Sequence, residues 1–119
     1  MTIRRFEDLQ CWQLARQLTN DVYSITREGR FAKDFELRNQ IRRASSSGMH
    51  NIAEGFDGGS HAEFIKFLRY ARRSCTEVQS QLYLALDQGY LQAEDFDKLY
   101  AQAQEIREKV MALIRYLKR

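Results

Sequence analysis

The chain has 119 residues, of which 44% are hydrophobic and 29% are charged, and its formal net charge is +3 at pH 7. This length suits one domain around one core, and the composition excludes a largely disordered chain. The N-terminus lacks the apolar run of a signal peptide, and no stretch approaches about 18 uncharged apolar residues. We therefore expect a cytoplasmic protein without a membrane partner, in which Cys11 and Cys75 are small buried thiols.

The sequence contains no proline, which favours long helices, and the first half predicts two of them. The first covers about residues 7 to 28 and ends at Gly29. Its expected inward residues are Leu14, Leu18, Val22 and Ile25. The second begins near Asp34 and turns at Gly58 and Gly59. Its expected inward residues are Leu37, Ile41, Ala44, Ile52 and Phe56.

The second half predicts two further helices with regular heptad seams. The third helix runs from about residue 60 to 88, with Ser60 and Glu63 as a capping box and Gly89 as its stop. Its seam is Leu68, Ala71, Cys75, Val78, Leu82 and Ala85. The seam of the fourth helix is Phe96, Leu99, Ala103, Ile106, Val110, Leu113 and Leu117.

All the predicted connections are short, so consecutive helices should pack antiparallel. We therefore predict an all-α, up-down antiparallel four-helix bundle that occupies residues 1–119 as a single domain. Some apolar residues fall outside the seams, namely Phe6, Trp12, Phe31, Phe64, Phe67, Tyr83, Tyr100, Met111 and Tyr116. They can belong to a wide apolar stripe within the bundle or to a second buried surface between subunits, and the sequence leaves both interpretations open.

The segment RNQIRRASSSGMHNIAEG, residues 38–55, is unusual for a helix because it contains three consecutive serines and two glycines. It resembles helix two of the 23S rRNA intervening-sequence protein family, with a pattern close to Q-I-R-R-A-x-x-S-I-P-x-N-I-A-E-G. The matching residues are Gln40, Ile41, Arg42, Arg43, Ala44, Ser47, Asn51, Ile52, Ala53, Glu54 and Gly55. The chain departs from this pattern at Gly48 and Met49, where the family usually has Ile-Pro.

Two other segments carry the same resemblance. The family's E-F-x-x-F-L-x-x-A-x-x-S-x-x-E pattern is met by Glu63, Phe64, Phe67, Leu68, Ala71, Ser74 and Glu77. The opening FEDLQCWQLA is similar to the family's F-x-x-L-x-x-W-x-x-A. The resemblance implies a bacterial four-helix bundle that forms homo-oligomers, typically pentamers, and has no enzymatic activity. Related bundles bind nucleic acid, so RNA or DNA is an expected partner.

Four polar residues lie on one stripe of the second predicted helix: Gln40, Ser47, Asn51 and Glu54. Small residues surround this stripe and would let another backbone or a ligand approach closely. We interpret the stripe as a candidate oligomer interface or groove, with an ordinary solvated face as the alternative.

Six basic residues gather when the chain is folded about Asp57 and Gly58: Arg42, Arg43, Lys66, Arg69, Arg72 and Arg73. No acidic residue occurs in residues 37–53 or 64–76. Such a cluster is a candidate non-specific site for phosphate backbones, although pairing with nearby glutamates is an alternative.

The sequence offers little for catalysis or for a cofactor. His50 and Glu54 are four residues apart, with His61 as a distant third ligand, but no paired Glu-x-x-His motif is present. We expect no enzyme, metal, cofactor or small-molecule substrate. Two hypotheses remain: an oligomeric accessory protein that binds nucleic acid, and a structural ring that binds other proteins.

Overall fold

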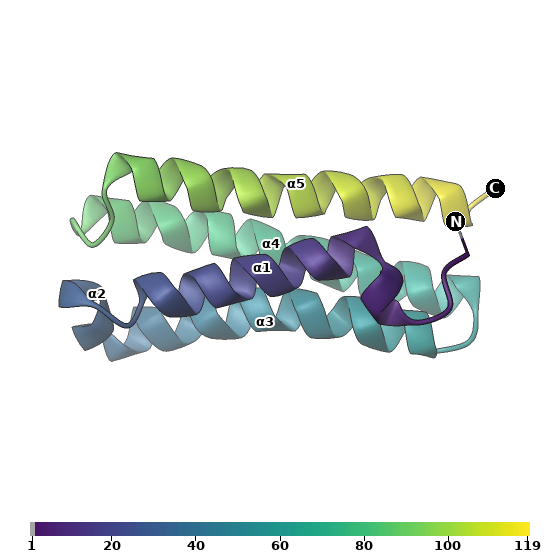
Figure 1. Ribbon diagram of the computed structural model, residues 1–119. Coiled ribbons are helices and arrows are strands. Elements are labelled where there is room, and N and C mark those ends of the chain that lie inside the picture. The colour runs from purple at the N-terminus through teal and green to yellow at the C-terminus, as the bar shows by residue number, and fades with distance from the viewer. Residues whose placement is uncertain (1) are drawn as a thin grey trace.

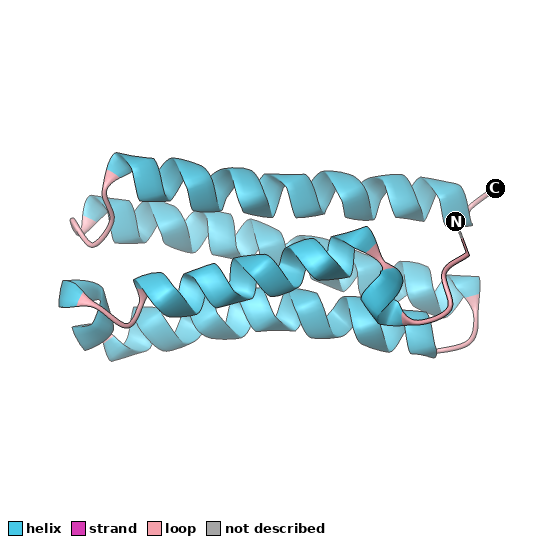
Figure 2. Cartoon of the chain, viewed as in Figure 1, coloured by secondary structure: helices cyan, strands magenta, loops and turns pink. Residues whose placement is uncertain are grey.

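The computed structural model describes residues 2–119, and this range is all-α without strands, as the sequence predicts (Figures 1 and 2). The elements are η1 (Phe6–Asp8), α1 (Gln10–Ile25), α2 (Gly29–Lys33), α3 (Phe35–Asp57), α4 (His61–Asp87) and α5 (Ala93–Leu117). Four of these helices are long, and η1 and α2 are short additions at the two ends of α1. Within the described residues, no helix is long and apolar enough to cross a membrane.

The four long helices lie side by side along the long axis of a molecule that measures 45 × 21 × 20 Å. Figure 1 shows that consecutive long helices run in opposite directions and that the N- and C-terminal ends lie at the same end of the molecule. Helix α3 packs against α1 and α4, and α5 packs against α4 and α1. Each long helix therefore has two long neighbours and one side that faces outward.

The core is built from the predicted seams. All six seam residues of α4 are buried, and so are Leu37, Ile41, Ala44 and Ile52 of α3. In α5 the seam shifts near its end, because Ile114 is buried while Leu113 is only half-buried. A straight α-helix drifts by about 20° per heptad relative to a strict seven-residue repeat, which turns the inward side of α5 toward Ile114 near its end.

The first predicted helix is wrong in its extent, because the structure divides residues 7–28 into η1, a break at Leu9, and α1. Helix α1 ends at Ile25, where the Thr26 hydroxyl donates to the Val22 carbonyl at 2.7 Å and completes the last turn. Gly29 has φ +61°, a conformation that favours glycine, and it begins α2 instead of closing α1. Helix α2 buries Phe31, whose ring stacks on Tyr90 at 5.3 Å between centroids.

The predicted turns of the other helices are present, and Ser60 makes one of the two hydrogen bonds of the predicted capping box. The Asp34 carboxylate accepts from the Leu37 N–H at 3.1 Å, and the Ser60 hydroxyl accepts from the Glu63 N–H at 3.1 Å. Gly89, with φ +77°, follows the end of α4. Cys11 and Cys75 are free and buried, and burial raises the pKa of Cys11 to about 11 and that of Cys75 to about 12.

Candidate nucleic-acid interface

The polar stripe of α3 meets α4 at Ser47, and three of its four residues are hydrogen-bonded within the subunit. The Ser74 hydroxyl of α4 donates to the Ser47 hydroxyl at 3.3 Å, and Asn51 Nδ2 donates to the Ser47 carbonyl at 2.9 Å. Gln40 donates to Glu36 at 3.4 Å. Glu54 is exposed. Helix α4 of the same chain therefore occupies the position next to Ser47, whereas Gln40 and Glu54 stay exposed.

The two glycines in this part of α3 have different surroundings. A Cβ atom built on Gly55 would lie 2.7 Å from Cβ of Phe67 and 3.1 Å from Cδ1 of Phe64. At Gly48 the nearest atom would be Cβ of Ser74, at an ordinary 3.7 Å. The closest approach of the two helices therefore requires glycine at position 55 and only tolerates it at position 48.

Four of the six predicted basic residues are exposed on α3 and α4, and we call these four the basic face: Arg43, Lys66, Arg69 and Arg73. Arg43 lies one turn from Ser47, and Arg73 precedes Ser74, so the contact between the two serines places these arginines on neighbouring turns. Lys66 pairs with Glu63 at 3.8 Å. Within residues 2–119, none of the three arginines has a carboxylate oxygen within 4.0 Å, and the basic face keeps most of its positive charge.

Arg42 lies apart from the basic face because its side chain turns toward α1. Its Nε donates to the Thr26 hydroxyl at 2.8 Å, and its guanidinium lies 4.6 Å from the centre of the Tyr23 ring. Position 42 follows the buried Ile41 on the side of α3 that meets α1. The structure thus gives Arg42 an internal contact between two helices.

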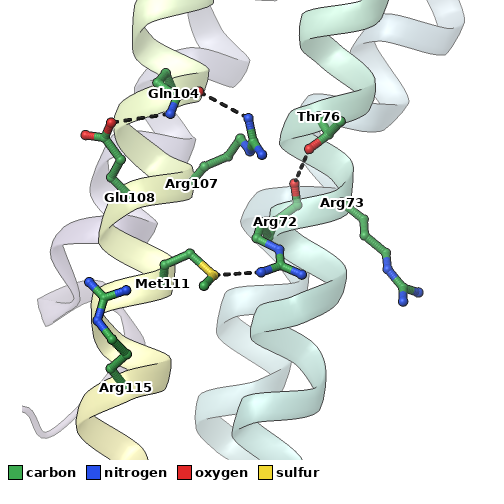
Figure 3. Close-up of a pocket in the computed structure, with 8 residues that line it drawn as sticks. All are labelled: Arg72, Arg73, Thr76, Gln104, Arg107, Glu108, Met111 and Arg115. Carbon is green, nitrogen blue, oxygen red and sulfur yellow. Dashed lines mark hydrogen bonds between the residues drawn. The ribbon is translucent and has the colours of Figure 1, made fainter.

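Arg72 turns toward α5 and lines an open groove of about 550 Å³ between α4 and α5, which we call the α4–α5 groove (Figure 3). The groove is lined by Arg72, Arg73, Thr76, Gln104, Arg107, Glu108, Met111 and Arg115. In Figure 3, Arg72 and Arg107 point into the space between the helices, while Arg73 points outward from α4. Four arginines thus share this surface with the single carboxylate of Glu108.

A buried glutamine holds one of these arginines in place. Gln79, which is 5% exposed, accepts from Arg107 Nη1 at 3.0 Å and donates to Gln104 Oε1 at 3.1 Å. Arg107 Nη1 also donates to Gln104 Oε1 at 3.1 Å, while its buried Nε has no hydrogen-bond partner. The guanidinium is therefore fixed in position with donor capacity to spare, since arginine offers five N–H donors.

The sequence reasoning missed Arg107 and Arg115 as partners of Arg72. Arg107 could have been found by counting residues on either side of a turn, as was done for Asp57 and Gly58. Counting in both directions from the turn after Gly89 places residue 72 at the same level as residue 107. The heptad position of Arg107, directly after the buried Ile106, is the second signal.

Some of the apolar residues outside the seams belong to a wide apolar stripe within the bundle, and others remain exposed as a second apolar surface would require. Trp12, Phe31 and Phe64 are buried in the core, whereas Tyr83 and Tyr116 are 52% and 64% exposed. Phe6, Phe67, Tyr100 and Met111 are half-buried. In residues 2–119, no group of three or more His, Cys, Asp or Glu side chains is placed to hold a metal ion, and this includes His50, Glu54 and His61.

These features define a small all-helical protein with arginine-rich surfaces. The sequence model of the 23S rRNA-intervening sequence protein family matches residues 7–112, and the chain belongs to this family. Comparison with curated proteins found no match. The fold is similar to the crystal structure of a protein with unknown function from the S23 ribosomal protein family of Bacteroides thetaiotaomicron, with a TM-score of 0.81 and 23% identity over 88% of this chain and 95% of that one.

Proposed function

We propose that this protein is a non-catalytic, oligomeric accessory protein that binds nucleic acid without sequence specificity through the basic face on α3 and α4. The opposite directions of consecutive long helices support the up-down antiparallel four-helix bundle as its fold. The working form is a homo-oligomer, a pentamer by resemblance to the family, and the protein is cytoplasmic.

The observation that carries this proposal is the unpaired charge of the basic face. Arg43, Arg69 and Arg73 are exposed and have no carboxylate within 4.0 Å in the described residues. Surface arginines without an internal partner are available to phosphate oxygens, which supply most of the affinity in non-specific binding. A helix surface without a groove-reading motif positions a phosphate backbone but does not read bases.

Exposed apolar side chains support the oligomer. The ring of Tyr83 lies 4.9 Å from that of Phe96 and 5.8 Å from that of Tyr100, and the neighbouring Leu84 is 48% exposed. Aromatic residues gathered on a surface are typical of interface cores. The same cluster favours the second candidate function, a ring that binds other proteins and has no role with nucleic acid.

The test is a titration of fluorescent RNA and DNA oligonucleotides at two salt concentrations. A site that engages about four to six phosphates should lose affinity steeply, with log K falling by about 0.7–0.9 per phosphate for each tenfold rise in salt. Arg43→Glu/Arg69→Glu should weaken binding to RNA and DNA alike. Arg73 is left unchanged because it also lines the α4–α5 groove.

The matched control is Arg16→Glu/Arg27→Glu, which reverses two exposed charges on and just after α1. It changes the net charge by the same amount, so equal loss in both variants would point to overall charge instead of the basic face. Absence of binding by the wild-type protein at low salt would leave the protein-binding ring as the better function.

A further inference from the structure

The α4–α5 groove differs from the basic face in shape and in the support of its side chains. It is concave, and two of its arginines, Arg72 and Arg107, are half-buried instead of fully exposed. They come from different helices and point into the same space (Figure 3). A recessed pair of guanidinium groups is suited to a compact anion that enters the groove.

The charges in the groove are not balanced by the protein itself. Within the described part of the chain, Arg72, Arg107 and Arg115 have no carboxylate oxygen within 4.0 Å. Glu108 is the only acidic residue of the lining, and its carboxylate accepts from Gln104 at 3.3 Å. Like charges held near one another repel, so an anion between them would be favoured.

The donors are also underused. Arg72 Nη1 lies 2.7 Å from Sδ of Met111, and a thioether is only a weak hydrogen-bond acceptor. Arg107 directs Nη1 to Gln79 and Gln104, which leaves its second Nη group as a donor for an anion. Guanidinium groups bind phosphate oxygens in a bidentate manner, and groups held by a buried network lose less conformational entropy when they do so.

We propose that the α4–α5 groove is a phosphate-binding site formed by Arg72, Arg107 and Arg115, next to the basic face and sharing only Arg73 with it. Arg107 is the central ligand, held by Gln79 and Gln104. Arg115 is exposed and belongs to the lining on α5. The shared chemistry of the ligand is a phosphate group, which a free polyphosphate anion or a nucleic-acid backbone can supply.

The experiment uses inorganic pyrophosphate as the probe, titrated into the full-length protein at low salt by calorimetry. We expect binding by the wild-type protein and an affinity about tenfold or more lower in Arg107→Gln, since hydrogen bonds to charged groups are individually strong. Arg115→Gln should show the same direction of change. This variant alters an exposed residue, so it keeps the test valid if Arg107→Gln fails to fold.

The matched control is Lys109→Gln, which removes one exposed charge from the same helix outside the groove. It should bind pyrophosphate as the wild-type protein does. The proposal is overturned if the wild-type protein does not bind pyrophosphate, or if all the variants bind it equally. It is also overturned if Arg115→Gln lowers the oligomeric mass in light scattering and leaves pyrophosphate affinity unchanged, because the groove would then be a contact between copies.

A competition experiment separates the two sources of phosphate. If an oligonucleotide displaces pyrophosphate and loses affinity in Arg115→Gln by the same factor, the groove takes the nucleic-acid backbone. If the oligonucleotide binds without displacing pyrophosphate, the groove takes a free anion. Both results support a phosphate site, and neither depends on the outcome for Arg43→Glu/Arg69→Glu at the basic face.

Discussion

The contrast between Gly55 and Gly48 gives the sharpest test of how α3 and α4 pack. We expect Gly55→Ala to destabilise the protein and Gly48→Ala to leave it unchanged or stabilise it. Both glycines are buried on the same helix, so the general effect of replacing glycine by alanine is shared. The difference between the two variants therefore reports the space available between α3 and α4.

The magnitude follows from the distances. The added methyl group at position 55 would lie 2.7 Å from Cβ of Phe67, an atom attached directly to the α4 backbone. Rotation of the phenylalanine ring cannot relieve this contact, so the helices must separate by several tenths of an ångström. Overpacking of this kind costs about 1–3 kcal/mol, and the helix propensity of alanine returns about 0.5–1 kcal/mol.

At position 48 the nearest atoms would be Cβ of Ser74 at 3.7 Å and Sγ of Cys75 at 3.8 Å, which are ordinary contact distances. Gly48→Ala should therefore gain up to about 1 kcal/mol from reduced backbone entropy in the unfolded chain. At the middle of these ranges, Gly55→Ala should lose about 1 kcal/mol in net terms. The two variants should change stability in opposite directions.

The assay is urea unfolding followed by far-UV circular dichroism, at one fixed protein concentration because an oligomer's stability depends on concentration. If unfolding is driven by heat instead, a change of 1 kcal/mol in the free energy of unfolding should move the melting temperature by roughly 4 °C in a protein of this size. The reasoning is refuted if Gly55→Ala is as stable as the wild-type protein, or if the two variants change stability equally.

Three other measurements test the remaining assignments. Burial raises the pKa values of Cys11 and Cys75, so the stability that the two thiols contribute is complete below about pH 9 and falls as the pH rises toward 11 to 12. At about pH 10.5 each thiol should lower the free energy of unfolding by about 2 kcal/mol. The double variant Cys11→Ala/Cys75→Ala should therefore flatten the pH dependence of the unfolding free energy. Arg42→Gln should lower the free energy of unfolding by about 1–2 kcal/mol, because the contacts with Thr26 and Tyr23 are lost. Its affinity for oligonucleotides should change less than that of Arg43→Glu/Arg69→Glu. A larger loss of affinity in Arg42→Gln than in the double variant would place Arg42 in the binding surface. Light scattering at micromolar concentration should give a mass several times 14.1 kDa, and a mass near 14.1 kDa would rule out the oligomer.

Much of the fold follows from the sequence because the apolar period is long and uninterrupted in α4 and α5. The seam of α4 is buried throughout, since Ala71 and Ala85 are small enough to sit between close helices. The end of α1 at Ile25 does not follow from the period. It depends on the Thr26 side chain, which bonds to its own helix and accepts from Arg42 sixteen residues later.

The candidate site was predicted less completely for a geometric reason. Each long helix packs against two other long helices. Counting residues from a turn gives the height of a residue along the helix axis, but it does not say which of the two neighbouring helices the side chain meets. Arg42 and Arg43 are adjacent in sequence, yet a rotation of about 100° directs Arg42 to α1 and leaves Arg43 exposed. The same rotation separates Arg72 in the groove from Arg73, which points outward.

Neighbouring residues of α4 face three directions: toward α3, toward α5 and outward. Its side toward α3 carries small residues such as Ser74, which permit the close contact with Ser47 and position Arg43 beside it. Its side toward α5 carries Arg72, one position before the outward Arg73. The unusual composition of residues 38–55 follows from the first of these sides, because Gly55 and the serines let α3 approach α4 closely. Close packing of α3 on α4 at the two serines therefore also places Arg43 and Arg73 on neighbouring turns, so the small residues help to set the spacing of these two charges.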